Sequence, residues 1–211
     1  MNSVVAQPRT GRRSAALRVV LALTGAGAVV GALWVLLAPP AHGVVALNKS
    51  GERVHAYLGN EADNFFVAAT MLLGMLSVLA VVAAVAVWQW RAHRGPLMVA
   101  ALTVGSAVCA LAAAGVGTGL ARWRYGVLDI DAAPVTPDNR FHYFTEAPSV
   151  FFGHNAIQIA TGLLIPAMVA AMVYALLAIA AVRDDLGAYP PVTTPGSVPI
   201  ITGGAFRPSD W

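Results

Sequence analysis

The sequence has few charged residues and a single cysteine, and both shortages limit what the protein can be. Asp, Glu, Lys and Arg make up 11% of the 211 residues, against 58% hydrophobic residues. A soluble domain carries about 25% charged residues, so water is not the main solvent of this chain. Because Cys109 is the only cysteine, an intrachain disulfide and a cluster of thiolate metal ligands are both excluded.

Formal charges are absent from four stretches that reach the ~20 residues needed to cross a bilayer. These stretches are predicted to be transmembrane helices and cover about residues 19–38, 64–90, 97–121 and 156–182. The first is predicted to be retained, because it is longer than a signal-peptide core of about 7 to 15 residues and no small-x-small cleavage site follows. None of the four contains Asp, Glu, Lys, Arg or His, which argues against a proton-coupled carrier.

The arginines lie at the ends of these stretches and predict an orientation. Four of them fall in residues 1–18, a basic segment predicted to be cytoplasmic. With this segment inside, the inner side carries eight arginines, because Arg91, Arg94, Arg183 and Arg207 also fall there. The outer loops carry five positive residues, Lys49, Arg53, Arg122, Arg124 and Arg140. The sequence therefore predicts a multi-pass protein of a bacterial plasma membrane with both termini in the cytoplasm. Since the basic residues form no continuous stripe, the expected partner surface is the lipid bilayer and not nucleic acid.

The two outer loops, residues 39–63 and 122–155, are predicted to contain strands. VVALNKSGERVHAYL has two arms of β-type pattern around a Ser50-Gly51 turn, as in a hairpin. YGVLDI from Tyr125 and RFHYFT from Arg140 are also strand-like. Because a lone hairpin is marginally stable, the two loops are expected to pair. The predicted fold class is an all-α integral membrane protein, a four-transmembrane-helix bundle with a small extracytoplasmic β-containing cap.

Small residues predict one contact between the membrane helices. Gly27 and Gly31 on the first stretch, and Gly115 and Gly119 on the third, have the GxxxG spacing. This spacing lets two helix backbones approach closely. The first and third helices are therefore expected to pack on each other through these four glycines.

Two segments are candidate interaction surfaces. The outer loop before the fourth helix is rich in aromatic residues, and its candidates are Phe141, Tyr143, Phe144, Phe151 and Phe152. The segment 183–211 contains five prolines and four glycines, which predicts a disordered cytoplasmic tail. In this tail Tyr189, Pro190 and Pro191 are candidates for a polyproline turn. The partner expected for these surfaces is another membrane protein or a second copy of the chain.

Four of the five histidines fall in the outer loops, with most of the carboxylates nearby in sequence. They are His42, His55, His142 and His154. Imidazole and carboxylate form the ligand set of zinc and related ions, so these histidines are candidate metal ligands. No HExxH motif and no closely spaced pair supports a metal site, so a solvated hydrogen-bonding role and a proton switch near pH ~6 remain open alternatives. No cofactor is predicted.

Several stretches resemble one family. They are APPAHGVVALNKSGERVHAYLGNEADNFFVAA, VWQWRAHRGP, RYGVLDID, PDNRFHYFTEAPSVFFGH and RDDLGAYPP, which lie between Pro39 and Pro191. The chain resembles a family of actinobacterial, mycobacterial-type four-span membrane proteins of unassigned function. This resemblance implies a bacterial plasma membrane and a compact four-helix domain, and it supplies no catalytic residues.

The sequence favours a non-enzymatic membrane protein that serves as an accessory or scaffold of an envelope or membrane complex. The alternative is an extracytoplasmic metal-binding protein or metal-dependent enzyme that uses the outer histidines and carboxylates. No catalytic residue is predicted.

Overall fold

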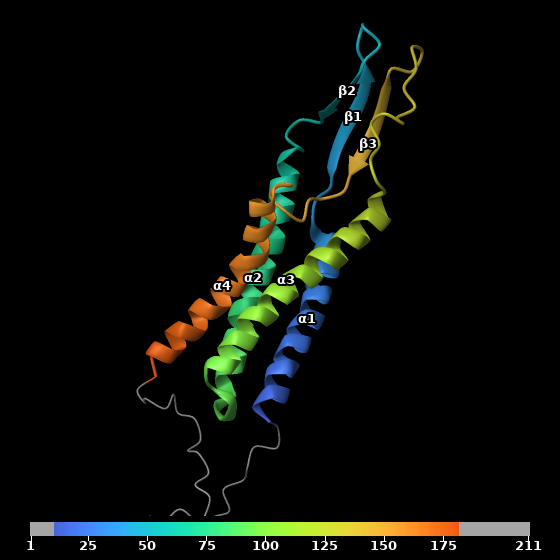
Figure 1. Ribbon diagram of the computed structural model, residues 1–211. Coiled ribbons are helices and arrows are strands. Elements are labelled where there is room, and N and C mark those ends of the chain that lie inside the picture. The colour runs from blue at the N-terminus through green and yellow to red at the C-terminus, as the bar shows by residue number, and fades with distance from the viewer. Residues whose placement is uncertain (1–10, 182–211) are drawn as a thin grey trace, which may run out of the picture.

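The computed structural model describes residues 11–181, and in these residues the backbone forms helices and one small sheet (Figure 1). The helices are α1 (Arg12–Leu37), α2 (Asp63–Gln89), η1 (Arg91–His93), α3 (Pro96–Tyr125) and α4 (Ala156–Ile179). The strands are β1 (Ala41–Leu47), β2 (Arg53–Tyr57) and β3 (Phe141–Glu146). The first ten residues and the tail with Tyr189, Pro190 and Pro191 lie outside the described residues.

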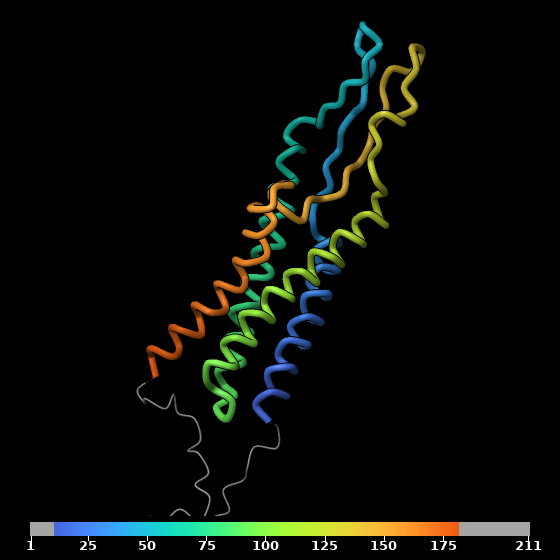
Figure 2. Tube along the Cα trace, viewed as in Figure 1, coloured from blue at the N-terminus to red at the C-terminus, as the bar shows by residue number. Residues whose placement is uncertain are grey.

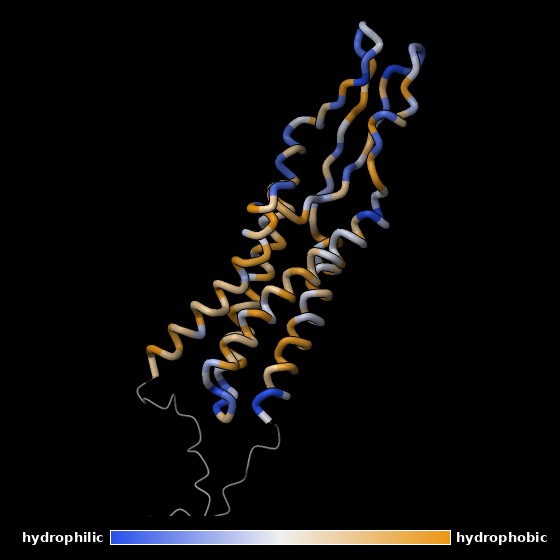
Figure 3. Tube along the Cα trace, viewed as in Figure 1, coloured by the Kyte–Doolittle hydropathy of each residue, from blue (hydrophilic) through white to orange (hydrophobic). Residues whose placement is uncertain are grey.

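Helices α1, α2, α3 and α4 are each long and apolar enough to cross a membrane, which indicates a multi-pass membrane protein. Apolar residues run along them, and hydrophilic residues gather near their ends and around the sheet (Figure 3). Helix α1 begins at Arg12, earlier than residue 19, and α3 ends at Tyr125, later than residue 121. Both helices continue past their apolar stretches because arginine side chains reach the lipid interface without breaking the helix.

The tightest contact in the helical part joins α1 to α3. A Cβ atom built on Gly27 would collide with the backbone carbonyl of Cys109, and one on Gly31 would collide with that of Ala113. Only glycine leaves room for backbones this close. The predicted contact between the first and third helices is therefore present.

On α3 this contact uses other glycines than the sequence predicts. A Cβ atom on Gly115 or Gly119 would have no neighbour within 4 Å, so the prediction for these two residues is wrong. The stripe that faces α1 passes through Cys109, Ala113 and Gly117. Gly115 lies two residues from this stripe, which is about 200° around a helix with 3.6 residues per turn.

Trp34 joins three helices near the sheet. Its side chain on α1 is completely buried, and its ring lies over Gly117 of α3, where a Cβ atom would come within 3.2 Å of the ring. The indole Nε1 donates a hydrogen bond of 2.8 Å to the backbone carbonyl of Ala68 on α2. Helix α4 completes the helical part by packing against α2 and α3 (Figure 2).

The sheet has the order β2-β1-β3, and both pairs are antiparallel. The hairpin of β1 and β2 is the predicted one, and the RFHYFT stretch forms β3. In the turn, Asn48 Oδ1 accepts hydrogen bonds from the backbone N–H groups of Ser50 and Glu52, and Gly51 has a φ of 79°. The sheet stands beyond the ends of α1 and α3, and its strands run roughly along the long axis of the molecule (Figure 1).

The predicted strand YGVLDI is not formed. Tyr125 completes α3, and Gly126 ends the helix with a φ of 77°. Asp129 Oδ1 then accepts hydrogen bonds from the backbone N–H groups of Asp131 and Ala132, a local turn that competes with strand pairing. Apolar side chains of this irregular segment pack against Val45 and Phe144 of the sheet instead.

The contact between α1 and α3 predicts that leucine destabilises the protein much more at Gly27 than at Gly115. Gly27→Leu forces the helices apart, because its Cβ atom meets the backbone of Cys109, and we expect a loss of about 1 to 3 kcal/mol or more. Gly115→Leu is the matched control, because it adds the same side chain where no atom lies within 4 Å. Thermal unfolding of both purified variants in detergent measures the difference. Equal unfolding temperatures would contradict the close contact.

Candidate functional site

The two faces of the sheet have different surroundings. Side chains of paired residues share a face, so the register places Val45, Tyr57 and Phe144 on one face, here called the covered face. The irregular segment after α3 packs on it through Ala133 and Val135. The opposite face, here called the bare face, carries Val44, Ala46, Val54, Ala56, Phe141 and Tyr143, with the pair His42 and Thr145 at the end nearest the helices.

Large side chains on the bare face are open to solvent. Phe141 is 62% exposed, Tyr143 is 69% exposed and Val54 is 50% exposed, whereas Phe144 on the covered face is 8% exposed. The register sets Phe141 opposite Ala46 and Tyr143 opposite Val44. The bare face is therefore a continuous apolar surface at the centre of the sheet.

The four predicted metal ligands are not brought together. His55 and His142 both pair with Val45, one on each side of β1, so two strand spacings of roughly 5 Å separate their backbones. His42 belongs to the other face of the sheet, since it lies an odd number of residues from Val45. His154 lies in the loop that leads into α4. Among residues 11–181, no group of three His, Cys, Asp or Glu residues is placed to hold a metal ion.

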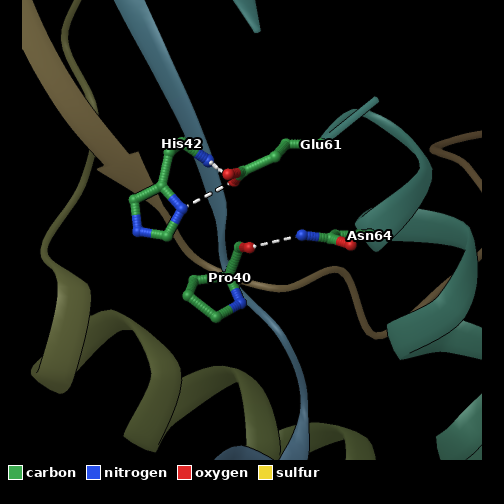
Figure 4. Close-up of polar contacts among 4 residues, drawn as sticks. All are labelled: Pro40, His42, Glu61 and Asn64. Atoms are coloured by element: carbon green, nitrogen blue, oxygen red, sulfur yellow. Dashed lines mark hydrogen bonds and ion pairs between the residues drawn. The ribbon is translucent and has the colours of Figure 1, made fainter. Parts of the chain in front are cut away.

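His42 has a structural partner in Glu61 (Figure 4). Glu61 Oε2 lies 2.6 Å from both the backbone nitrogen and the Nδ1 atom of His42. The hydrogen bonds from the His42 side chain and backbone hold the pKa of Glu61 below its ordinary value. Beside them, Asn64 Nδ2 donates a hydrogen bond of 2.8 Å to the carbonyl of Pro40. These bonds attach the start of α2 to the start of β1.

A cavity of about 800 Å³ lies at the end of the helices nearest the sheet. It is bounded by the start of α2, the end of α3 and the loop between β3 and α4. Its apolar lining includes Phe65, Phe66, Val150, Phe151 and Phe152, and its polar lining includes Tyr57, Arg122, Glu146 and His154. The cavity therefore combines aromatic walls with several groups that can form hydrogen bonds.

Tyr57 connects this cavity to the sheet. Its hydroxyl donates a hydrogen bond of 2.7 Å to Glu146 Oε2, and its ring meets Phe65 and Phe144 edge-on at 5.3 Å and 6.2 Å between centroids. Burial of the tyrosine, then the hydrogen bond to Glu146 and the charge of that carboxylate, raise the pKa of Tyr57 to about 12. Tyr57 therefore stays neutral and keeps Glu146 in a fixed position.

The predicted aromatic interaction residues are divided among three environments. Phe141 and Tyr143 belong to the bare face, and Phe144 is buried on the covered face. Phe151 and Phe152 line the cavity. The sequence prediction did not include Tyr57, Arg122 or Glu146, which complete the polar lining. Tyr57 and Glu146 come together because β2 and β3 pair with opposite edges of β1, and no sequence motif marks the pairing with β3.

The hydrogen bond of Tyr57 predicts a late step in a tyrosine titration. Because folding raises the pKa of Tyr57, its neutral form stabilises the folded state. This stabilisation is complete below pH ~10, where the tyrosine of the unfolded chain begins to ionise. It is lost as the pH rises toward 12. Tyrosinate absorbance of the purified protein should show a step near pH 12 that is missing from Tyr57→Phe. Glu146→Gln should shift this step to lower pH, and the exposed control Tyr143→Phe should retain it. A Tyr57→Phe titration with the late step intact would disprove the assignment.

Comparison with known proteins agrees with the resemblance seen in the sequence. The family described as "Protein of unknown function (DUF2567)" matches residues 23–188. The chain is 55% identical over 174 residues to the uncharacterized protein Rv1591 of Mycobacterium tuberculosis (strain ATCC 25618 / H37Rv), a match covering 82% of this chain and 90% of that protein. It is 53% identical over 169 residues to the uncharacterized protein ML1222 of Mycobacterium leprae (strain TN), covering 80% and 85%. No solved structure gives a significant match. The chain is therefore a member of the DUF2567 family, as its match to the family and its identity to these two uncharacterized mycobacterial proteins show.

Proposed function

We propose that the protein is a non-enzymatic accessory or scaffold of a membrane or envelope complex. Its bare face would bind an extracytoplasmic segment of another membrane protein. The observation that carries this proposal is the exposure of Phe141 and Tyr143 at 62% and 69% on one face of a three-stranded sheet.

The bare face differs from the usual exposed face of a sheet. An antiparallel sheet normally has one face on a core and one polar face in water. Here the covered face already packs on its own cluster, and the bare face presents Val44, Val54, Phe141 and Tyr143. Contiguous apolar surface of this kind marks interfaces, and tyrosine is enriched in their centres. The bare face thus has the composition of a binding surface.

The position of the sheet favours a protein over lipid as the occupant. The helices supply segments of 24 to 30 residues, enough to cross about 30 Å of hydrocarbon, and the sheet stands beyond their ends (Figure 1). The excess of arginine at the opposite end supports a bacterial plasma membrane location with both termini in the cytoplasm. In that orientation the bare face lies beyond the hydrocarbon on the outer side of the membrane, where a protein partner would remove it from water.

The metal-dependent alternative lacks comparable support. His42 is engaged with Glu61, and His55 and His142 lie on opposite sides of β1. Within the described residues 11–181, no three His, Cys, Asp or Glu residues are grouped as metal ligands.

Photo-crosslinking tests the proposed surface. A photoreactive amino acid at Val54, 50% exposed on the bare face, should give an adduct with one membrane protein in native membranes. The control position is Val127, 82% exposed but outside the strands, and it should not give this adduct. An adduct between two copies of the chain would replace the proposed partner with a homodimer. Absence of any adduct at Val54 would overturn the proposal.

The aromatic side chains are expected to supply much of the binding energy. Phe141→Ser and Tyr143→Ser should each weaken binding of the purified crosslinked partner by roughly 30-fold, equivalent to about 2 kcal/mol for a central aromatic contact. Val127→Ser removes an exposed apolar side chain elsewhere at this end and should leave the affinity unchanged. Equal effects of all three variants in a binding titration would show that the bare face is not the interface.

A further inference from the structure

We propose that the cavity at the sheet end binds a phospholipid from the adjacent leaflet, with the lipid phosphate on Arg122. This inference is independent of the bare face, because it uses the space among the start of α2, the end of α3 and the loop between β3 and α4. It assigns a ligand class and a charged contact to a site made of residues that lie far apart in the sequence.

The size and walls of the cavity fit an amphiphile. Its volume of about 800 Å³ is within the range of roughly 300 to 1,000 Å³ found for ligand sites. Phe66 of α2 and Phe152 of the loop form one wall, with ring centroids 5.5 Å apart. Phe66 is 65% exposed and Phe152 is 36% exposed, so these rings are available to apolar chains.

The floor of the cavity continues toward the apolar part of the helices. Phe151 lies against α4, where a Cβ atom on Gly162 would come within 3.3 Å of the ring. Below it is a small void whose lining includes Leu72 of α2, Ala114 of α3 and Leu163 of α4. Because Val150, Phe151 and Phe152 line both spaces, the larger cavity ends on apolar groups at its membrane side. Acyl chains fit this environment better than a soluble polar ligand does.

The polar end of the cavity favours a phosphate. The Arg122 side chain forms no hydrogen bond or ion pair with another residue of the described part of the chain. A guanidinium donates paired hydrogen bonds that match phosphate oxygens. His154 of the cavity lining lies two residues before the start of α4, and the first turn of that helix contains no acidic residue. The positive end of that helix dipole therefore adds to the attraction of an anion.

Glu146 restricts the headgroup further. Its carboxylate lines the same cavity and accepts the hydrogen bond from Tyr57. A second negative charge on the ligand would be repelled by this carboxylate, whereas an ammonium or hydroxyl group would donate a hydrogen bond to it. The arrangement thus fits a phosphodiester headgroup with a terminal donor, as in phosphatidylethanolamine or phosphatidylglycerol.

Titration of the purified full chain with lipids, followed by native mass spectrometry, tests this site. The probes are phosphatidylethanolamine, diacylglycerol with the same chains, and free glycerol phosphate. Phosphatidylethanolamine should bind as a single retained copy, and Arg122→Gln should weaken it by about tenfold or more, as expected for one charge-assisted contact. Arg124→Gln is the matched control, because Arg124 lies near the Tyr125 ring and not in the cavity lining.

Each comparison has a result that overturns the inference. Diacylglycerol should bind more weakly than phosphatidylethanolamine and respond equally little to both arginine variants, since it has no phosphate. Equal retention of the two lipids, or equal losses in Arg122→Gln and Arg124→Gln, would rule out a phosphate site at Arg122. Displacement of the lipid by glycerol phosphate at similar concentrations would identify a site for soluble anions instead. Unfolding temperatures of the two variants show whether a loss of binding reflects loss of the fold.

Discussion

The close contact between α1 and α3 determines where the sheet and the segment that covers it leave the helices. Gly27 and Gly31 allow the two backbones to meet, and Trp34 fixes the same pair to α2 through its bond to Ala68. Strand β1 begins four residues after α1 ends, and the segment that packs on the sheet follows directly from α3. Because α1 and α3 run side by side, a strand and the segment that covers it emerge next to each other (Figure 2).

A second set of contacts joins the sheet to α2 and so shapes the cavity. Glu61 and Asn64 bond to the chain around the start of β1, and Tyr57 packs on Phe65 while holding Glu146. These contacts lie at the first residues of α2 and beyond them, where hydrogen bonding to water competes with them. These contacts are nevertheless specific, because each contact joins residues from different parts of the fold.

The sequence allowed prediction of the features that depend on local pattern. Long uncharged stretches predicted the helices, and the arms around Ser50 and Gly51 predicted the hairpin. The sequence also predicted that the first and third helices meet and that the two loops pair, but it did not predict which residues form these contacts. GxxxG spacing suggested Gly115, but the contact stripe of α3 contains Gly117. YGVLDI has strand propensity, yet Gly126 and the turn at Asp129 override it. The cavity was missed because Arg122 and Glu146 belong to different elements that only the fold brings together.

Successive side chains of strand β3 point to opposite faces of the sheet, so this strand contributes to both the bare face and the covered face. Phe141 and Tyr143 belong to the bare face, while Phe144 and Glu146 belong to the covered face and, through Glu146, to the cavity rim. Insertion or deletion of one residue ahead of Phe144 would exchange these roles, because side chains in a strand repeat every two residues. The spacing from Phe141 to Glu146 is thus constrained by parity: a change in chain length preserves both surfaces only in the loops on either side of the strand.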